Sequence, residues 1–367
     1  MGLHAAVNLA DTVLALAAAV ACRALALGRG HRGRPRRAFR YGADLYALAV
    51  KGNLNHLTHL LNPCGVFERV YVACFDPRSL TLPPPAPWLK PVLLSRWRWR
   101  RVIQIARLCR RERIGLFRCL GPNEAALAGL CLKIALARLP IVLSTGGDHR
   151  LSQDLRGAYA FGCRRLSFLV ERLIYRRADL IFCINACTRR LIARLGGPTD
   201  RLVLNPIRID TTLFDPSRAD GPAVRRRLGL PDDDKVVLFV GRLERDKLAD
   251  LVFDAMPRVL RAHPDARLVV VGDGSQRADL ERRAREGGFA DRVRFEGFQD
   301  NEALAGFYAA ADVVCIPVSG FVVFEAAAMA RPIVALDVDW QAEFVEDGVT
   351  GRLVPERDPD RLADGIA

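Results

Sequence analysis

The sequence predicts an α/β protein built from two parallel-sheet domains that face each other across a cleft. Short apolar runs alternate with helical patterns from residue 44 onward, which is typical of parallel βαβ units. A strand-poor stretch with Pro, Gly and three consecutive Asp interrupts this alternation at residues 207–234, and the pattern restarts at residue 235. Ligands of open α/β sheets bind beyond the carboxyl ends of the strands, so we expect the functional residues there.

Composition limits the class of protein. The chain has 367 residues, of which 50% are hydrophobic, and this excludes a disordered chain and favours more than one domain. A net charge of +14 indicates an acidic partner such as nucleic acid, an anionic membrane or a phosphorylated substrate. Only five of the 55 basic residues are Lys, so we attribute part of the excess to a genome-wide preference for Arg.

The ten cysteines predict no metal centre. Most lie in apolar stretches, no C-x-x-C pair occurs, and the spacing of Cys183 and Cys187 does not suit a zinc site. We expect buried free thiols in a reducing compartment.

Residues 1–40 form an apolar and basic N-terminal segment. An apolar run from Ala5 to Leu27 is broken by Asp11 and Arg23, and an Arg cluster follows it. Three interpretations remain open: an interfacial amphipathic helix, a poor signal anchor, or a wrongly assigned start codon. We favour contact with a membrane surface over a membrane span.

The first domain is predicted to cover residues 41–206. Its expected strands are 44–50, 67–75, 114–120, 140–145, 178–185 and 201–206. The expected helices lie near 54–61, 96–113, 122–138, 160–177 and 186–196. The segment "RSLTLPPPAPWLKP" (78–91) is expected to be a Pro-rich loop.

The second domain is predicted to cover residues 235–367, after a linker at 207–234 with one short helix. Its expected strands are 235–241, 266–272, 293–298, 312–317 and 332–337. The expected helices are 247–262, 276–287, 300–310 and 322–330. The sequence stops within the helical pattern "DRLADGIA", so we expect this domain to be truncated.

The stretch "FVGRLERDK" (239–247) is a candidate phosphate site. Gly241 ends a strand and allows a ligand to approach the backbone closely. Arg242 offers a fork of donors for phosphate oxygens, and Lys247 offers a compact positive charge. The alternative is a run of solvated surface charges.

The stretch "VVVGDGSQRADLE" (269–281) is a weaker candidate. Gly272 and Gly274 follow a strand and precede a helix, so this loop could approach a nucleotide. A plain strand-turn-helix unit gives the same pattern.

The stretch "CIPVSGFVVFEAAAMARPIVA" (315–335) places one carboxylate inside an apolar helix. Ser319 and Gly320 begin this helix, whose free N–H groups can bind a diphosphate. Glu325 could accept hydrogen bonds from ribose hydroxyls, as acidic residues do in dinucleotide sites. The alternative is a partly exposed glutamate or a local ion pair.

Two loops of the first domain are candidates for the remaining chemistry. Asp148 and His149 in "TGGDHR" follow a strand and could act as catalytic groups on the donor sugar or on an acceptor hydroxyl; the alternative is that they cap a helix. Gly52 and Asn53 in "GNLNH" form the first strand-to-helix loop, which would touch the acceptor or the diphosphate.

The stretch "RWRWRRVIQIARLCRRER" (96–113) is an Arg-rich helix with two tryptophans. Trp97 and Trp99 among arginines suggest an element at a membrane interface. The alternative is an ordinary amphipathic helix that packs on the sheet and exposes its arginines to solvent.

Five segments in order resemble the C-terminal domain of the GT-B glycosyltransferases of family 4, the "glycosyl transferase group 1" set. They are "FVGRLERDK", "VVVGDGSQRADLE", "VRFEGFQDNEALAGFYAAADVVCIP", "FEAAAMARPIVA" and "EFVEDGVTGRLV". The first domain resembles the family more loosely, through "GPNEAALAG", "IVLSTGGDHR", "ADLIFCINACTRRLIARLG" and "NPIRIDTTLFDP". The resemblance covers about residues 44–367 and implies two Rossmann-like domains.

This resemblance implies that the second domain holds a nucleotide-diphosphate sugar and that the first domain binds the acceptor. Arg242 and Lys247 match the basic pair that neutralises the leaving diphosphate, and Glu325 matches the second Glu of an E-x7-E motif, which holds the ribose. The family usually retains anomeric configuration and needs neither metal nor cofactor. For this reason we discount "DVD" (337–339) as a metal site. The expected acceptor is a glycan or a lipid-linked or cell-envelope molecule, and the expected location is the cytoplasm or the inner face of the membrane.

One position departs from the family pattern. Pro317 stands eight residues before Glu325, where the family has its first Glu, which contacts the sugar. A second hypothesis is therefore a catalytically degenerate member that binds nucleotide or an anionic surface. A nucleic-acid binder ranks last, because no RNP, KH or helix-turn-helix signature occurs.

Overall fold

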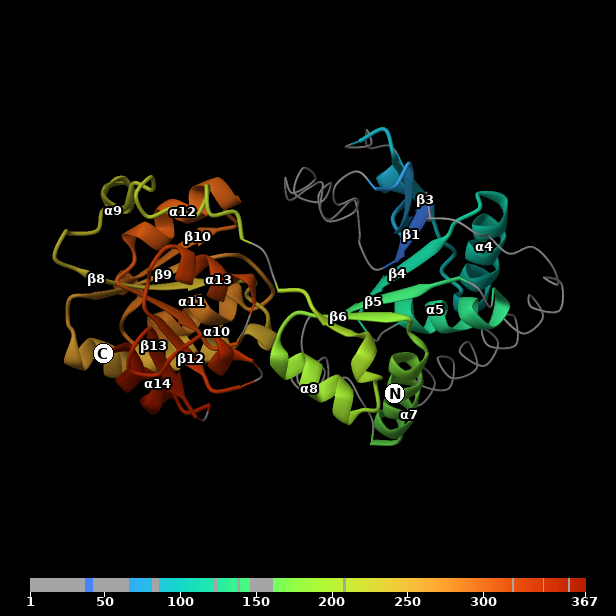
Figure 1. The fold of residues 1–367 in the computed structure, drawn as a ribbon. Coiled ribbons are helices and arrows are strands. Elements are labelled where there is room, and N and C mark those ends of the chain that lie inside the picture. Colours follow the sequence, from blue (N-terminus) through green and yellow to red (C-terminus); the bar gives the residue numbers. More distant parts are fainter. Residues whose placement is uncertain are drawn as a thin grey trace. The chain divides into compact units, whose positions relative to one another are not determined.

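The computed structural model describes residues 37–41, 66–80, 86–121, 124–136, 139–145, 161–206, 209–318, 320–338, 340–355 and 357–367. Among these residues the chain forms two compact units that divide between Asn205 and Pro206. Each unit contains one parallel sheet with helices packed on it (Figure 1). The predicted α/β class with two parallel sheets is therefore confirmed.

Unit 1 is built on a seven-stranded sheet in the order β3-β2-β1-β4-β5-β6-β7. The strands are β1 (Arg37–Tyr41), β2 (Arg69–Cys74), β3 (Leu89–Leu93), β4 (Leu116–Leu120), β5 (Ile141–Thr145), β6 (Leu180–Cys183) and β7 (Leu202–Leu204). The helices are α4 (Arg98–Arg111), α5 (Glu124–Ala135), α7 (Phe161–Arg177) and α8 (Ala186–Arg194). Ile105, Leu132, Ile174 and Ile192, one from each helix, share a core with Phe117 of β4, so these helices cover one face of the sheet.

Two predictions for unit 1 need correction or qualification. The predicted Pro-rich loop contains the edge strand β3, which pairs with β2 and includes Pro91; an edge strand tolerates proline because one side of it makes no ladder. The predicted strand at 44–50 lies outside the described residues. The central strand is instead Arg37–Tyr41, which pairs with both β2 and β4.

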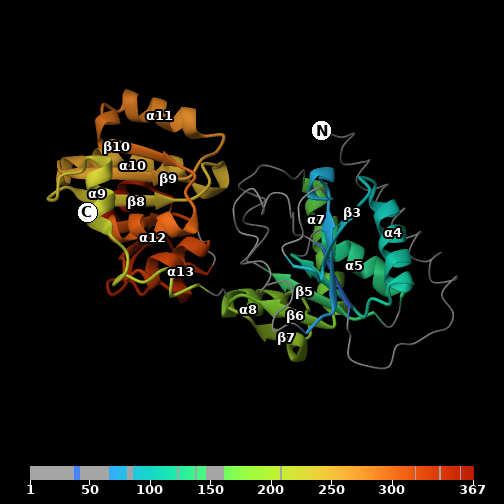
Figure 2. The same ribbon diagram turned by 90° about the horizontal axis from the view of Figure 1, so that it is seen from above.

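Unit 2 is built on a six-stranded sheet in the order β10-β9-β8-β11-β12-β13. The strands are β8 (Lys235–Val240), β9 (Ala266–Val271), β10 (Val293–Gly297), β11 (Val313–Ile316), β12 (Ile333–Leu336) and β13 (Gly351–Val354). The helices are α9 (Gly221–Leu228), α10 (Ala249–Ala262), α11 (Arg277–Glu286), α12 (Asn301–Ala310), α13 (Phe321–Ala328) and α14 (Pro359–Ile366). Helices α10, α11 and α14 share one core, and α12 and α13 share another on the opposite face (Figure 2).

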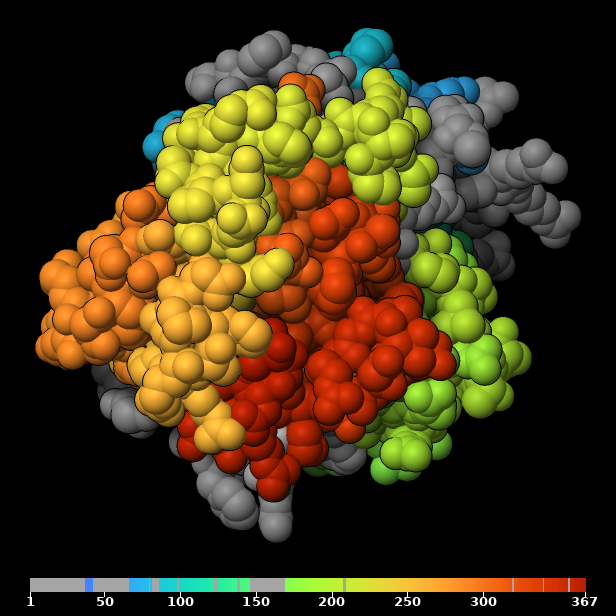
Figure 3. Space-filling model, turned by 90° about the vertical axis from the view of Figure 1, so that its left-hand side faces the viewer, coloured from blue at the N-terminus to red at the C-terminus, as the bar shows by residue number. Residues whose placement is uncertain are grey.

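The segment predicted as a linker packs within unit 2. Asp220 caps the start of α9, because its side chain accepts a hydrogen bond from the Ala223 N–H, and the helix lies against α12. A Cβ on Gly221 would stand 2.5 Å from the Ala309 carbonyl oxygen, so this contact needs glycine. Figure 3 shows the yellow surface of this segment lying on the orange and red surface of the same unit. Strand β13 and its pairing with β12 were not predicted.

The described cysteines are free thiols, and all of them except Cys187 are buried. Burial raises the pKa of Cys119 and of Cys315 to about 12, so both remain protonated and inert at neutral pH. Among the helices that the structure describes, none has the length and apolar content that crossing a bilayer requires.

Candidate functional site

The strand order of unit 2 creates a switch point between β8 and β11. The chain runs outward in one direction from β8 through β9 to β10, and then returns to place β11 on the other side of β8. Loops that leave the carboxyl ends of β8 and β11 therefore diverge, which is where open α/β sheets bind ligands. Gly241 and Arg242 leave β8, and Pro317 leaves β11.

The structure brings Lys247 to the start of α13. Lys247 ends a short 3-10 turn, Arg245–Lys247, and Leu248 follows in the left-handed region with φ 53°. The Lys247 Nζ lies 3.8 Å from the place that a Cβ on Gly320 would occupy. An ammonium group and the first amides of a helix thus share one location, and both attract anions. Ser319 itself lies outside the described residues.

Arg242 lies at the same edge of the sheet but is already paired. Its guanidinium donates to Asp246 Oδ2 at 2.9 Å, and about half of the side chain is exposed. A phosphate that reached Arg242 would have to share it with Asp246. Its predicted role on the diphosphate stays a prediction.

Gly272 and Gly274, in the loop that follows β9, allow this loop to pack closely against the loop that follows β8. A Cβ on Gly272 would stand 1.9 Å from the Gly241 carbonyl oxygen, and a Cβ on Gly274 would stand 2.4 Å from that of Leu243. Gly272 also has φ +134°, a conformation that other residues rarely adopt. These glycines therefore let the β9 loop lie against the β8 loop, and a contact with nucleotide remains a prediction.

A solvent-exposed polar contact joins the same two loops. Both oxygens of Glu244 accept hydrogen bonds from Ser275, one from its hydroxyl at 2.7 Å and one from its N–H at 3.1 Å. These bonds lower the pKa of Glu244, so its carboxylate stays charged at neutral pH.

Glu325 is buried and has one hydrogen-bond donor. It lies on α13 with 9% of its surface exposed, and Oε2 accepts from the Tyr308 hydroxyl at 2.7 Å. Burial raises the pKa of Glu325, and the hydrogen bond from Tyr308 opposes that rise. Among the described residues Oε1 accepts no hydrogen bond, so one carboxylate oxygen is committed to Tyr308 and the other is available.

Pro317 stands where the family pattern has an acid, and its backbone is fixed by Gln341. The Gln341 Nε2 donates to the carbonyl oxygens of Pro317, at 3.0 Å, and Leu336, at 2.8 Å. Gln341 is fully buried, and it ties the ends of β11 and β12 together. Neither Tyr308 nor Gln341 was predicted from the sequence. A tyrosine within the apolar helix "ALAGFYAA" is the signal that could have indicated the first.

The predicted residues of unit 1 are not tested by the structure. Gly52, Asn53, Asp148 and His149 all lie outside the described residues, as does Asp339 of the discounted "DVD". The residues that are described contain no group of three or more His, Cys, Asp or Glu side chains arranged to hold a metal.

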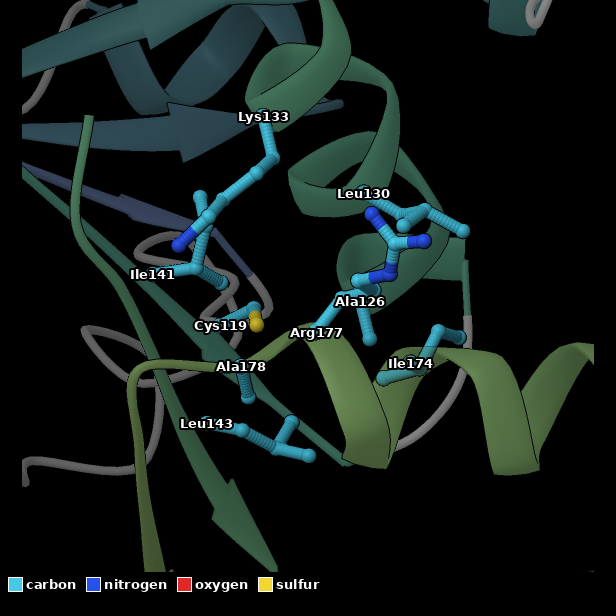
Figure 4. A pocket seen from close by; sticks show the side chains of 9 residues that line it. All are labelled: Cys119, Ala126, Leu130, Lys133, Ile141, Leu143, Ile174, Arg177 and Ala178. Atoms are coloured by element: carbon cyan, nitrogen blue, oxygen red, sulfur yellow. The ribbon is translucent and has the colours of Figure 1, made fainter. Parts of the chain in front are cut away.

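A small pocket in unit 1 does not form a second site. It lies between α5 and α7 above the sheet, with Cys119 and Leu143 among its lining and Lys133 and Arg177 at its rim (Figure 4). Its open space, about 10 Å³, suits a single water molecule. Lys133 is also bound to Asp179, so this cavity is a packing gap.

Comparison with known protein families gives a consistent result for both units. Residues 234–367 match the family described as "Glycosyl transferases group 1", and residues 5–208 match a "Glycosyl transferase 4-like domain".

Individual proteins support the same grouping. The alpha-D-kanosaminyltransferase of Streptomyces kanamyceticus is 35% identical over 254 residues, which cover 68% of this chain and 65% of that protein. A D-inositol 3-phosphate glycosyltransferase of Acidothermus cellulolyticus is 38% identical over 191 residues, 48% of this chain and 42% of that protein. The chain thus spans about half the length of the curated relatives it matches.

Solved structures agree in fold. Anabaena Alr3699/HepE, solved in complex with UDP-glucose, has a TM-score of 0.70 at 22% identity, with 90% of this chain and 88% of that chain covered. A sucrose-phosphate synthase from Thermosynechococcus elongatus has a TM-score of 0.70 at 20% identity, with 90% of this chain and 88% of that chain covered. At these identities the likeness establishes the fold.

Proposed function

The chain belongs to the glycosyl transferase group 1 family, with a glycosyl transferase 4-like domain in its first half, and on this premise we propose that it transfers a sugar from a nucleotide-diphosphate sugar to an acceptor. The observation that carries the proposal is the placement of Lys247 at the start of α13, the helix that also holds the buried Glu325. A cation, a helix N-terminus and a buried carboxylate then lie along one short stretch of the fold.

Each of these groups suits one part of the donor. The diphosphate gains negative charge as it leaves, and the Lys247 ammonium, the α13 amides and Arg242 can stabilise that charge without reorganising. The available oxygen of Glu325 accepts hydrogen bonds from ribose hydroxyls. A nucleoside-diphosphate donor is also supported by the neighbour HepE, which was solved with UDP and with UDP-glucose.

The transfer step exchanges one C–O bond for another. The acceptor hydroxyl oxygen bonds to the anomeric carbon while that carbon's bond to the diphosphate breaks, and the hydroxyl proton is released. The bonding pair leaves with the diphosphate, which is why cations at that end accelerate the reaction. Family membership supports retention of configuration and no requirement for a metal.

The acceptor side of the proposal rests on the sequence. We assign the acceptor to unit 1, with Gly52 and Asn53 in its binding loop and with Asp148 and His149 near the reacting hydroxyl. The acceptor class is a glycan or a lipid-linked or cell-envelope molecule, which places the protein in the cytoplasm or against the inner face of the membrane.

A competing function is nucleotide binding without transfer, and Pro317 favours it. The family's first acid is absent, and the proline ring in its place has no group that could hydrogen-bond to a sugar. The Pro317 carbonyl oxygen already accepts a hydrogen bond from Gln341. A member of this kind would bind the nucleotide-sugar and leave it intact.

A thermal-shift screen with UDP-, GDP- and ADP-sugars tests the proposal. We expect one donor to raise the Tm, and Lys247→Ala to weaken its binding by about 10- to 100-fold, the effect of one hydrogen bond to a charged group. Arg245→Ala is the matched control, since Arg245 is an exposed cation on the same 3-10 turn.

Two outcomes would count against this function. If the Lys247 and Arg245 variants bound the donor with equal affinity, the assignment of Lys247 to the diphosphate site would be wrong. Donor binding without release of nucleoside diphosphate, in the presence of lipid and glycan acceptors, would establish the competing function.

A further inference from the structure

The net positive charge of this protein comes from the first half of its sequence. Residues 1–205 hold 33 of the 55 Lys and Arg but only 11 of the 41 Asp and Glu, a net charge of +22. Residues 206–367 hold 22 basic and 30 acidic residues, a net charge of −8. A genome-wide preference for Arg would act on both halves, so the excess in unit 1 needs its own explanation.

Helix α4 and the two residues before it, Arg96 and Trp97, display part of this charge outward. Arg96, Arg100 and Arg107 are exposed, and no carboxylate of the described residues lies within ion-pair distance of them. The Arg96 guanidinium lies 5.1 Å from the centre of the Trp97 ring, and 41% of that indole is exposed. A large amphipathic ring is thus held at the surface beside unpaired cations.

Glu112, at the end of α4, does not offset this charge. It accepts hydrogen bonds from the Tyr71 hydroxyl at 2.7 Å and from Arg111 at 3.0 Å. Its carboxylate also lies 3.6 Å from the Arg37 guanidinium, so it is shared between Tyr71 and two arginines other than Arg96, Arg100 and Arg107.

Helix α7 repeats the same combination of exposed apolar and basic side chains. Leu169 is 61% exposed and Leu173, one turn later, is 41% exposed. Arg172 and Arg176 are exposed beside them. The two leucines form a short exposed apolar stripe, and the flanking arginines give this stripe a positive border.

Helices α4 and α7 belong to one layer. Both pack against α5, and the three helices share the core on a single face of the unit 1 sheet (Figure 1). Their exposed sides are therefore the outer surface of that layer. We call these residues (Arg96, Trp97, Arg100, Arg107, Leu169, Arg172, Leu173 and Arg176) the basic–apolar surface.

We propose that the basic–apolar surface binds an anionic lipid bilayer. Arginines attract anionic headgroups, while tryptophan and leucine insert at the boundary between headgroups and acyl chains. A nucleic acid would satisfy the arginines but would leave two exposed leucines without a partner. The proposal does not depend on the donor site of unit 2, so either can fail alone.

Co-sedimentation of the full chain with vesicles tests the proposal. We expect binding to phosphatidylcholine vesicles that contain phosphatidylglycerol, weak binding to phosphatidylcholine alone, and a decrease as salt is raised. Replacing Arg96, Arg100 and Arg107 together by Gln should weaken binding about 100-fold, because each arginine contributes about fivefold. Leu169→Ser with Leu173→Ser should weaken it about tenfold and leave the salt dependence unchanged.

The charge-matched control lies in unit 2. Arg282, Arg283 and Arg285 of α11, replaced together by Gln, remove the same charge and should leave vesicle binding unchanged. Circular dichroism and donor-induced thermal shift report whether each variant is folded. Equal binding to neutral and anionic vesicles would overturn the proposal, and so would a leucine variant that binds like wild type. Tighter binding to a DNA duplex than to anionic vesicles would identify a nucleic-acid surface instead.

Discussion

Helices α4 and α11 are both rich in arginine, yet they differ in how that charge is used. Helix α4 has six arginines and no acidic residue, whereas α11 has four arginines and three acidic residues. In α11 the arginines pair along the helix, for example Arg277 with Glu281 and Arg282 with Glu286. The comparison shows that arginine content alone predicts little. The arrangement of acidic partners decides whether an arginine-rich helix is self-neutralised or presents charge to a ligand.

The same reasoning explains why Lys247 is informative. Residues 206–367 carry a net negative charge, and many arginines of unit 2 form ion pairs with carboxylates of the same unit, as Arg225 does with Asp312 and Arg267 with Asp234. Lys247 in the same unit lies beside the N-terminus of α13. The two units share the inner strand order but differ in net charge, and the functions that we propose for them differ accordingly.

The largest effect that we expect concerns the close backbone contact between the loops that follow β8 and β9 in unit 2. Gly272→Ala should lower the free energy of unfolding by about 3–5 kcal/mol, because the new Cβ overlaps the Gly241 carbonyl and φ is positive. Gly229→Ala is the control: φ is +63° but no atom lies within 4 Å, so the cost is about 1 kcal/mol. Urea denaturation measures both, and similar losses in the two variants would refute the packing argument.

The next effect concerns Glu325, a buried carboxylate that forms no ion pair with any described residue. Tyr308→Phe removes the hydrogen bond to Glu325 and should cost about 1–3 kcal/mol at neutral pH. It should also raise the pKa of Glu325 further, because that hydrogen bond favours the charged form.

The pH dependence has a definite sign. The folded-state pKa of Glu325 lies above its unfolded value, so the carboxyl is protonated in both states at acidic pH and stability falls as pH rises through the folded pKa. The Tyr308→Phe variant should therefore lose more stability near pH 7 than near pH 4. Adding Glu325→Gln should abolish that difference, and a loss that is independent of pH in the single variant would contradict this account.

A smaller effect distinguishes an ion pair with a mostly buried arginine from an exposed ion pair, both in unit 2. Asp312→Asn should cost about 1–2 kcal/mol, because Asp312 Oδ2 accepts from Arg225 at 2.7 Å and from the Val236 N–H at 2.8 Å, and Arg225 is mostly buried. Asp364→Asn, which removes an exposed pair with Arg258, should cost less than about 0.5 kcal/mol. Thermal unfolding of both variants checks this, and equal costs would mean that burial of Arg225 does not matter.

Most of the fold could be predicted because parallel strands are buried on both faces and are continuous apolar runs. The strand β3 was missed because proline signals a loop unless the strand is known to be an edge. The strand β13 was missed because "GRLV" is short and holds few apolar residues. Pairing partners far apart in sequence decide both cases, and a local pattern does not contain them.

Candidate site residues could be chosen from the sequence where a residue type alone suggests chemistry. Gly241, Lys247, Gly320 and Glu325 could be selected from the ends of predicted strands. Tyr308 and Gln341 could not, because their roles come from contacts with residues 17 and 24 positions away on other elements. The glycines of the second loop were selected for a ligand, and the structure shows that they first satisfy a contact between two loops.

The smallest effect on stability gives the sharpest test of the comparison between α4 and α11. Arg282→Gln and Arg100→Gln each remove one exposed cation, and each should shift the Tm by less than about 2 °C, because exposed ion pairs and exposed charges contribute little to folding. Their effects on vesicle binding should differ. Arg100→Gln should weaken binding to anionic vesicles about fivefold, whereas Arg282→Gln should leave it unchanged because Asp279 and Glu286 already neutralise Arg282. If the two variants lose binding equally, net charge controls association and the difference in pairing between the two helices has no functional meaning.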